Sequence, residues 1–116
     1  MKVQNYSDVQ STYFDGEIAK GVTGRVLIGK EDGADNFCMR FFELSKDGYT
    51  PRHSHEWEHE IFVYSGSGAV FNKGEWVNVE SGYSIFIPSN EEHQIKNIGD
   101  VPFAFICIIP SGVPEL

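Results

Sequence analysis

All four histidines of the 116-residue chain lie in two short windows. His53, His55 and His59 occupy the first window, and His93 occupies the second. His53 and His55 are separated by one residue, a spacing that places both side chains on one face of a β-strand. His59 follows closely enough to return to that face after a tight bend. Because imidazole is a common ligand of transition metals, the pattern predicts a metal site that closes when the two windows meet on folding.

Arg40 is the second candidate functional residue, because it interrupts the apolar run from Phe37 to Phe42. A single charge in such a run points either to solvent or into a cavity. Inside a cavity its guanidinium is suited to anchor a carboxylate, since Arg and carboxylate groups pair through two parallel hydrogen bonds. We treat Arg40 as a candidate substrate anchor and leave the two orientations open.

The composition excludes several classes of protein. A net charge of −8 and the absence of any Lys/Arg run argue against a nucleic-acid partner. No segment approaches the roughly 20 apolar residues of a membrane span, and the N-terminus lacks the apolar stretch of a signal peptide. Cys38 and Cys107 lie in apolar runs and are expected to be buried, reduced thiols, with a disulfide between them as the alternative. We therefore expect a cytoplasmic protein.

Short runs of Val, Ile, Phe and Tyr, separated by Gly, Asn, Asp and Pro, predict an all-β fold for a single domain of residues 1–116. The predicted strands are 24–28, 37–44, 60–64, 68–71, 75–79, 84–87, 94–97 and 103–109. Asn72, Lys73 and Gly74 predict a hairpin turn. Residues 30–36 are expected to form a loop, and those after Pro110 a short tail. Both faces of strand 103–109 are apolar, so which face lines a cavity stays open.

These residues resemble the two sequence motifs of the cupin superfamily. The first motif, G-x5-H-x-H-x3,4-E-x6-G, spans about residues 48–66 and aligns with Gly48, His53, His55, His59 and Gly66, with one residue fewer between Gly48 and His53 than the pattern has. The second, G-x5-P-x-G-x2-H-x3-N, spans about residues 82–97 and aligns with Gly82, Pro88, Asn90, His93 and Asn97. Asn90 stands in place of a glycine, and Asn adopts left-handed backbone angles more readily than most residues. The resemblance implies a small cupin jelly-roll barrel, also called a double-stranded β-helix.

The resemblance departs from the family pattern at one chemically important position. His59 stands where the first motif has glutamate, with three residues between it and His55 and six between it and Gly66. Glu60 fits the longer spacing after His55, but the step to Gly66 is then too short. The resemblance therefore implies a ligand set of His53, His55, His59 and His93, similar to the four-histidine manganese cupins of bacteria. Glu60 is expected on the opposite strand face from His59.

A four-histidine site implies one divalent transition metal per chain, with Mn or Fe favoured and Ni, Zn or Cu as alternatives. Four neutral imidazoles leave the full charge on the ion, which suits an anionic or enolate-forming molecule. The expected function is that of a metal-dependent, dioxygenase-like oxidoreductase acting on a small molecule inside the barrel. The alternative is a module that binds or senses a small molecule or a metal without turnover. A homodimer is expected, because pairing hides exposed edge strands.

Overall fold

Nine antiparallel β-strands build the fold, and two single turns of 3-10 helix are its only helical segments. The computed structural model describes every residue from 1 to 116. The 3-10 turns are η1 (Tyr6–Asp8) and η2 (Lys30–Asp32). The strands are β1 (Thr12–Phe14), β2 (Lys20–Ile28), β3 (Phe37–Tyr49), β4 (His59–Ser65), β5 (Ser67–Asn72), β6 (Glu75–Glu80), β7 (Ser84–Ile87), β8 (Ile95–Asn97) and β9 (Phe103–Pro110). The prediction of an all-β chain is confirmed.

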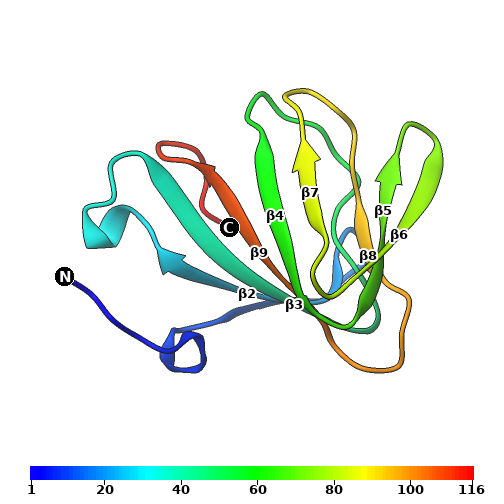
Figure 1. Ribbon diagram of the computed structural model, residues 1–116, viewed down its shortest axis with the longest axis horizontal. Coiled ribbons are helices and arrows are strands. Elements are labelled where there is room, and N and C mark those ends of the chain that lie inside the picture. Colours follow the sequence, from blue (N-terminus) through cyan, green and yellow to red (C-terminus); the bar gives the residue numbers. More distant parts are fainter.

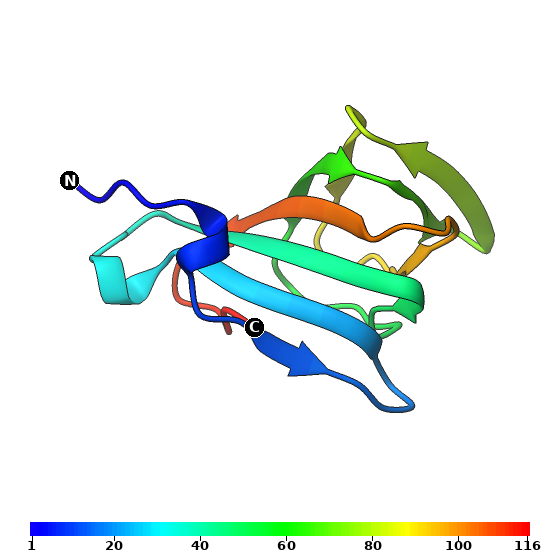
Figure 2. The ribbon, with the colours of Figure 1, turned by 90° about the horizontal axis from the view of Figure 1, so that it is seen from below.

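One continuous sheet contains all nine strands and curls on itself, as Figure 1 shows. Its order is β6-β5-β8-β3-β9-β4-β7, with β2 beside β3 and β1 beside β2. Seen from below, β2, β3 and β9 run side by side, and β5 and β6 stand apart from them (Figure 2). β3 connects the strands on its two sides in the sheet. Its residues 37–44 pair with β9, whereas Tyr49 at the far end pairs with Lys96 of β8. This curled sheet is the predicted jelly-roll.

The alternation of side chains along β4 and β9 determines what faces the interior of the curled sheet. On β4, His59 is buried at 7% exposure whereas the next residue, Glu60, is exposed, as predicted for opposite strand faces. The inward, buried side chains of β9 are Phe103, Phe105, Cys107 and Ile109. This answers the question that the sequence left open, because the face that carries Phe105 and Cys107 lines the cavity described below.

Two turns that contain residues with positive φ confirm the expected turn chemistry. Lys73 (φ 51°) and Gly74 (φ 84°) connect β5 and β6 as the two central residues of a tight hairpin. Positive φ at both positions matches the right-handed twist of the flanking strands. Asn90 has φ 65°, the left-handed conformation expected where the family motif has glycine. The turn at Asn90 bears on the site, because the N–H of Asn90 donates to the carbonyl of His55 at 2.7 Å.

Two features of the fold differ from expectation, and the state of the two cysteines agrees with it. β1 was not predicted, because its three residues gain strand structure only by pairing with β2. The residues after Pro110 are not a free tail, since Pro114 and Leu116 line the internal cavity. Cys38 and Cys107 are both free and buried, as expected for thiols, and no disulfide joins them. None of the helical segments is long or apolar enough to cross a membrane.

Candidate metal centre

His53 and His93 face each other across an isolated antiparallel bridge that ties the two histidine windows together. The N–H of His53 donates to the carbonyl of His93 at 3.1 Å, and the N–H of His93 donates to the carbonyl of His53 at 2.9 Å. The prediction that His53 and His55 lie on one regular strand was wrong. Only this bridge forms there, and the chain bends at residues 56–57 before β4 begins at His59. The bend allows the first window to turn its imidazoles inward.

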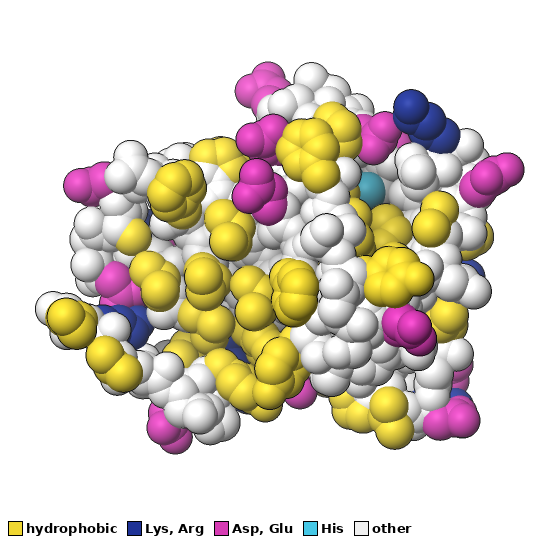
Figure 3. Space-filling model, in the orientation of Figure 1, with side chains coloured by type: hydrophobic (Ala, Val, Ile, Leu, Met, Phe, Trp, Pro, Cys, Tyr) yellow, Lys and Arg dark blue, Asp and Glu magenta, His cyan; other side chains and the backbone are white.

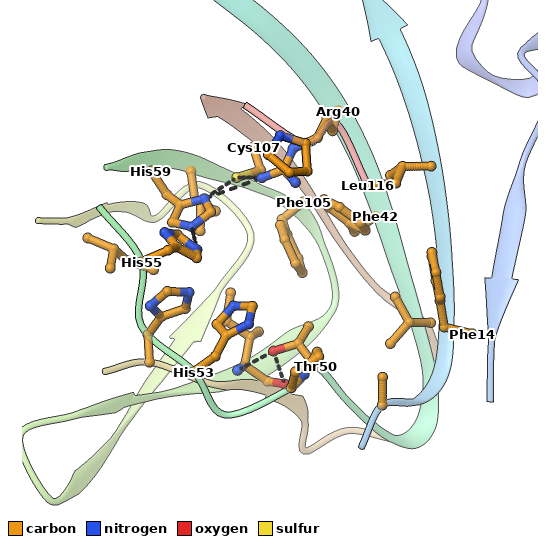
Figure 4. A pocket seen from close by; sticks show the side chains of 18 of the residues that line it. Phe14, Arg40, Phe42, Thr50, His53, His55, His59, Phe105, Cys107 and Leu116 are labelled. Carbon is orange, nitrogen blue, oxygen red and sulfur yellow. Dashed lines mark hydrogen bonds between the residues drawn. The ribbon is translucent and has the colours of Figure 1, made fainter. Parts of the chain in front are cut away.

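All four predicted ligands converge on one side of the interior. His53, His55 and His93 each offer a ring nitrogen, and these three atoms lie within 4.8 Å of one another. His59 joins them from the first residue of β4, with its Nε2 atom 2.8 Å from Nε2 of His55. The ring centroid of His59 lies 4.9 Å from that of His93. Figure 4 shows the labelled His53, His55 and His59 gathered on the same side of the cavity.

Backbone carbonyl groups fix the orientation of two of the rings. Nδ1 of His55 donates to the carbonyl of Trp57 at 3.1 Å, and Nδ1 of His93 donates to the carbonyl of Glu91 at 2.9 Å. A carbonyl can only accept, so the proton of each neutral ring lies on Nδ1 and the Nε2 lone pair is free to bind a cation. The indole of Trp57 also stacks on His55, with ring centroids 4.1 Å apart and planes inclined by 7°.

Lowered pKa values favour the neutral form of the four imidazoles, which is the form that binds metals. Desolvation lowers the pKa of His53 to about 4 and that of His59 to about 3. The pKa values of His55 and His93 are also lowered, mainly by desolvation. Neighbouring imidazoles and the Arg40 guanidinium act in the same direction, because a second positive charge nearby is unfavourable. At neutral pH the four rings are therefore neutral, which is the charge state in which an imidazole binds a cation.

The second ring nitrogen of His59 contacts two buried polar groups. Nδ1 of His59 lies 3.3 Å from Nη2 of Arg40 and 3.2 Å from Sγ of Cys107. Arg40 is only 8% exposed and lines the cavity, so its side chain points inward rather than to solvent. Burial raises the pKa of the Cys107 thiol. Cys107, which the sequence predicted as a buried thiol of the core, therefore also belongs to this cluster.

The histidines form part of the wall of a cavity of about 460 Å³. Opposite them lie Phe14 and Leu116, with Phe42 and Phe105 between the two sides, as Figure 4 shows. In the space-filling view, a histidine side chain is visible in a hollow between the two halves of the molecule (Figure 3). A volume of this size is typical of pockets that bind small organic molecules.

The donor set fits a divalent transition metal. Nitrogen ligands bind such ions at about 2.0–2.1 Å, so two ligands at right angles lie roughly 2.9 Å apart. The 2.8 Å between the Nε2 atoms of His55 and His59 agrees with this spacing. The same distance is also that of an N–H···N hydrogen bond between the two rings. The histidine group is therefore able to hold a metal ion, and its chemistry does not select one ion among Mn, Fe, Ni, Cu and Zn.

Three comparisons with known proteins agree with this architecture. The polyketide cyclase RemF from Streptomyces resistomycificus is 38% identical, and the alignment covers 95% of this chain and 79% of that chain with a TM-score of 0.88. A predicted oxalate decarboxylase from Thermotoga maritima is 26% identical, with coverage of 94% and 98% and a TM-score of 0.83. Glucose-6-phosphate isomerase from Pyrococcus furiosus is 28% identical over 94 residues, which are 71% of this chain and 50% of that protein.

The chain spans about half the length of this isomerase and of several other curated relatives that it matches. Their complete activities therefore do not transfer directly to it. The family assignment has a broader basis, since residues 40–109 match the cupin domain. This segment contains both histidine windows, Arg40 and most of the curled sheet. Because the match covers well over half of its length, the chain belongs to the cupin domain family.

Proposed function

We propose that this chain is a divalent-metal-dependent enzyme that closes rings in a small molecule carrying several carbonyl groups. The observation that carries the proposal is the cavity of about 460 Å³ in which the histidine cluster adjoins an apolar, aromatic wall. The 38% identity with the polyketide cyclase RemF, over 95% of the chain, supports this type of reaction. A cupin fold alone would not, because one fold supports many chemistries.

Ring closure of this kind needs no oxidant. A carbon next to one carbonyl loses a proton and forms a C–C bond to the carbon of a second carbonyl of the same molecule. The electron pair of that carbonyl moves to its oxygen, which takes up a proton, and loss of water follows. His53, His55, His59 and His93 would hold a divalent ion, which would supply Lewis-acid chemistry at a carbonyl group.

The protein's own contribution is to confine the substrate. Phe14, Phe42 and Phe105 give the cavity a rigid apolar surface against which a flexible chain can fold back on itself. Holding two reacting carbons close together replaces an improbable encounter in solution with a pre-arranged one. The same surface excludes water, which would otherwise compete for the polarised carbonyl.

The test is incubation of the metal-loaded protein with a linear poly-β-ketone acid, with and without oxygen, followed by mass spectrometry. We expect a product lighter by one or more water molecules under both conditions, and none beyond the spontaneous background from the His93→Ala variant. The proposal fails if the metal-loaded protein leaves the rate and distribution of ring products unchanged from the protein-free background.

An oxygen-dependent, dioxygenase-like activity is the second candidate. It is supported by an imidazole donor set that suits Fe and Mn and by apolar walls that would protect a reactive intermediate from water. A product that gains oxygen atoms only in air would favour this candidate over the cyclase. Tight binding of the poly-β-ketone without any product would instead favour a non-catalytic binding module.

A further inference from the structure

Arg40 is a buried cation without a carboxylate partner. Its exposure is 8%, yet the ion pairs of the structure are Lys2–Asp32, Arg25–Glu43 and Lys46–Asp100. A buried charge is unfavourable unless an opposite charge or a full set of hydrogen bonds compensates it. Arg40 has no such charge beside it, so its guanidinium is available to an anionic ligand.

The contacts of the guanidinium leave donor capacity unused. Nη2 of Arg40 donates to Sγ of Cys107 at 2.9 Å and lies 3.3 Å from Nδ1 of His59. Nη1 makes a long contact of 3.4 Å with the carbonyl of Glu115. Nε is buried and has no partner at all. Since the guanidinium has five N–H groups, at least the Nε donor stays unsatisfied. The ring of Phe42, with its centroid 4.9 Å from the guanidinium carbon, packs against the group.

The electrostatics of the cavity differ in sign from those of the whole chain. The chain carries a net charge of −8, yet no Asp or Glu is among the 20 residues that line the cavity. Arg40 has the one permanently charged side chain among the lining residues, and the four histidines lie beside it. In a weakly solvated space this charge acts strongly, because little water is present to screen it. The cavity therefore favours an anionic ligand over a neutral ligand of equal shape.

We propose that Arg40 forms an anion-binding subsite that selects substrates bearing a carboxylate group. The carboxylate sits against the guanidinium, next to the histidine cluster, and the apolar part of the molecule lies along Phe42, Phe105 and Phe14. The inference deepens the proposed function, on which it rests for the reaction, by naming the substrate class. Binding of the carboxylate itself requires no metal.

The experiment compares two probes of nearly identical shape, 2-naphthoate and the neutral 2-naphthamide, by isothermal titration calorimetry. Both are titrated into the full chain, metal-free and zinc-loaded. We expect metal-free wild-type protein to bind the carboxylate about ten- to a hundredfold more tightly than the amide, the range typical of a charge-assisted hydrogen-bonded pair. Arg40→Gln should abolish this preference without weakening amide binding. Arg40→Lys, which keeps the charge but not the paired donors, should retain part of it.

Arg52→Gln is the matched control, since it removes the same charge from an arginine that is exposed and stacks on Phe71 outside the cavity lining. It should keep the full carboxylate preference. The proposal is overturned if Arg40→Gln retains the preference, if Arg52→Gln loses it equally, or if the metal-free wild-type protein does not distinguish the probes. If Arg40→Gln does not fold, the preference of the wild-type protein for the carboxylate and its partial loss in Arg40→Lys still test the proposal.

The zinc-loaded titration separates this inference from the proposed function. A chain that binds no metal but prefers naphthoate through Arg40 would support the anion subsite and contradict the metal-dependent cyclase. The opposite result is a wild-type protein that binds metal and an Arg40→Gln variant that still prefers the carboxylate. It would overturn the subsite and leave the proposed metal centre intact.

Discussion

Trp57 is predicted to tune the metal affinity of the chain without being a ligand. Its indole stacks on His55 at 4.1 Å, while its backbone carbonyl accepts the hydrogen bond from Nδ1 of the same ring. The substitution Trp57→Ala removes the stacking but retains the carbonyl. It therefore isolates the contribution of the indole to holding the His55 ring in position.

The magnitude follows from the energy of one aromatic pair. Stacked pairs contribute about 0.5–1.5 kcal/mol beyond the area that they bury. If this energy is lost from a positioned ligand, the metal dissociation constant should rise about two- to tenfold. Trp57→Phe keeps a ring against His55 and should change the constant by less. His55→Ala removes a ligand and should weaken binding more than either Trp57 variant.

The assay is competition for zinc against a chromophoric chelator at neutral pH. Trp57 also packs against the core, so Trp57→Ala will lower stability, and the titration must be run where urea unfolding shows each variant to be folded. An affinity unchanged in Trp57→Ala would refute the reasoning, since His55 would then be oriented by its hydrogen bond alone. A loss as large as that of His55→Ala would also refute it.

Three further predictions concern stability and assembly. In the metal-free chain, lowered histidine pKa values such as those of His53 and His59 mean that the unfolded state binds more protons between about pH 6.5 and 4. Stability should therefore be full above pH 6.5 and decline toward pH 4, by up to about 1.4 kcal/mol per pH unit for the buried His59 and by less for the exposed His53, whose charge solvent screens; a flat series of urea midpoints would contradict this. Gly68→Ala should cost about 1–3 kcal/mol in urea unfolding, because the added methyl group would lie 2.5 Å from the ring of Phe103, whereas Gly16→Ala, in open space, should cost far less. We expect light scattering to find a homodimer, and Phe62→Glu, which replaces an outward-facing side chain that is 51% exposed, should shift it to monomers.

The parts of the fold that local sequence determines were predicted well. The strand 84–87 has the bounds of β7, and the turn at Lys73 and Gly74 forms as expected, because alternation and turn chemistry act over a few residues. β1 was missed because a three-residue strand has no pattern of its own and depends on its partner. The extended strand expected through His53 and His55 is replaced by one bridge, which only the position of His93 determines.

The grouping of the histidines in the candidate site was predictable, but their surroundings were not. The spacing of the histidines and the resemblance to cupin motifs named all four rings that the structure brings together. The contact between Arg40 and Cys107 arises because β3 and β9 pair with these two residues opposite each other, although 67 positions separate them in the chain. Sequence alone gives no register for such distant strands. The stacking of Trp57 on His55 was missed for a similar reason, since it depends on the geometry of the bend between them.

The most direct test of the metal centre is elemental analysis of untagged protein as purified, beside the His93→Ala variant. We predict about one divalent transition metal ion per chain in the wild-type protein, as expected for a single mononuclear site. The variant should lose most of it, since His93 holds the second histidine window against the first. A wild-type chain that is empty and also binds no added Mn, Fe, Ni, Cu or Zn would contradict the account.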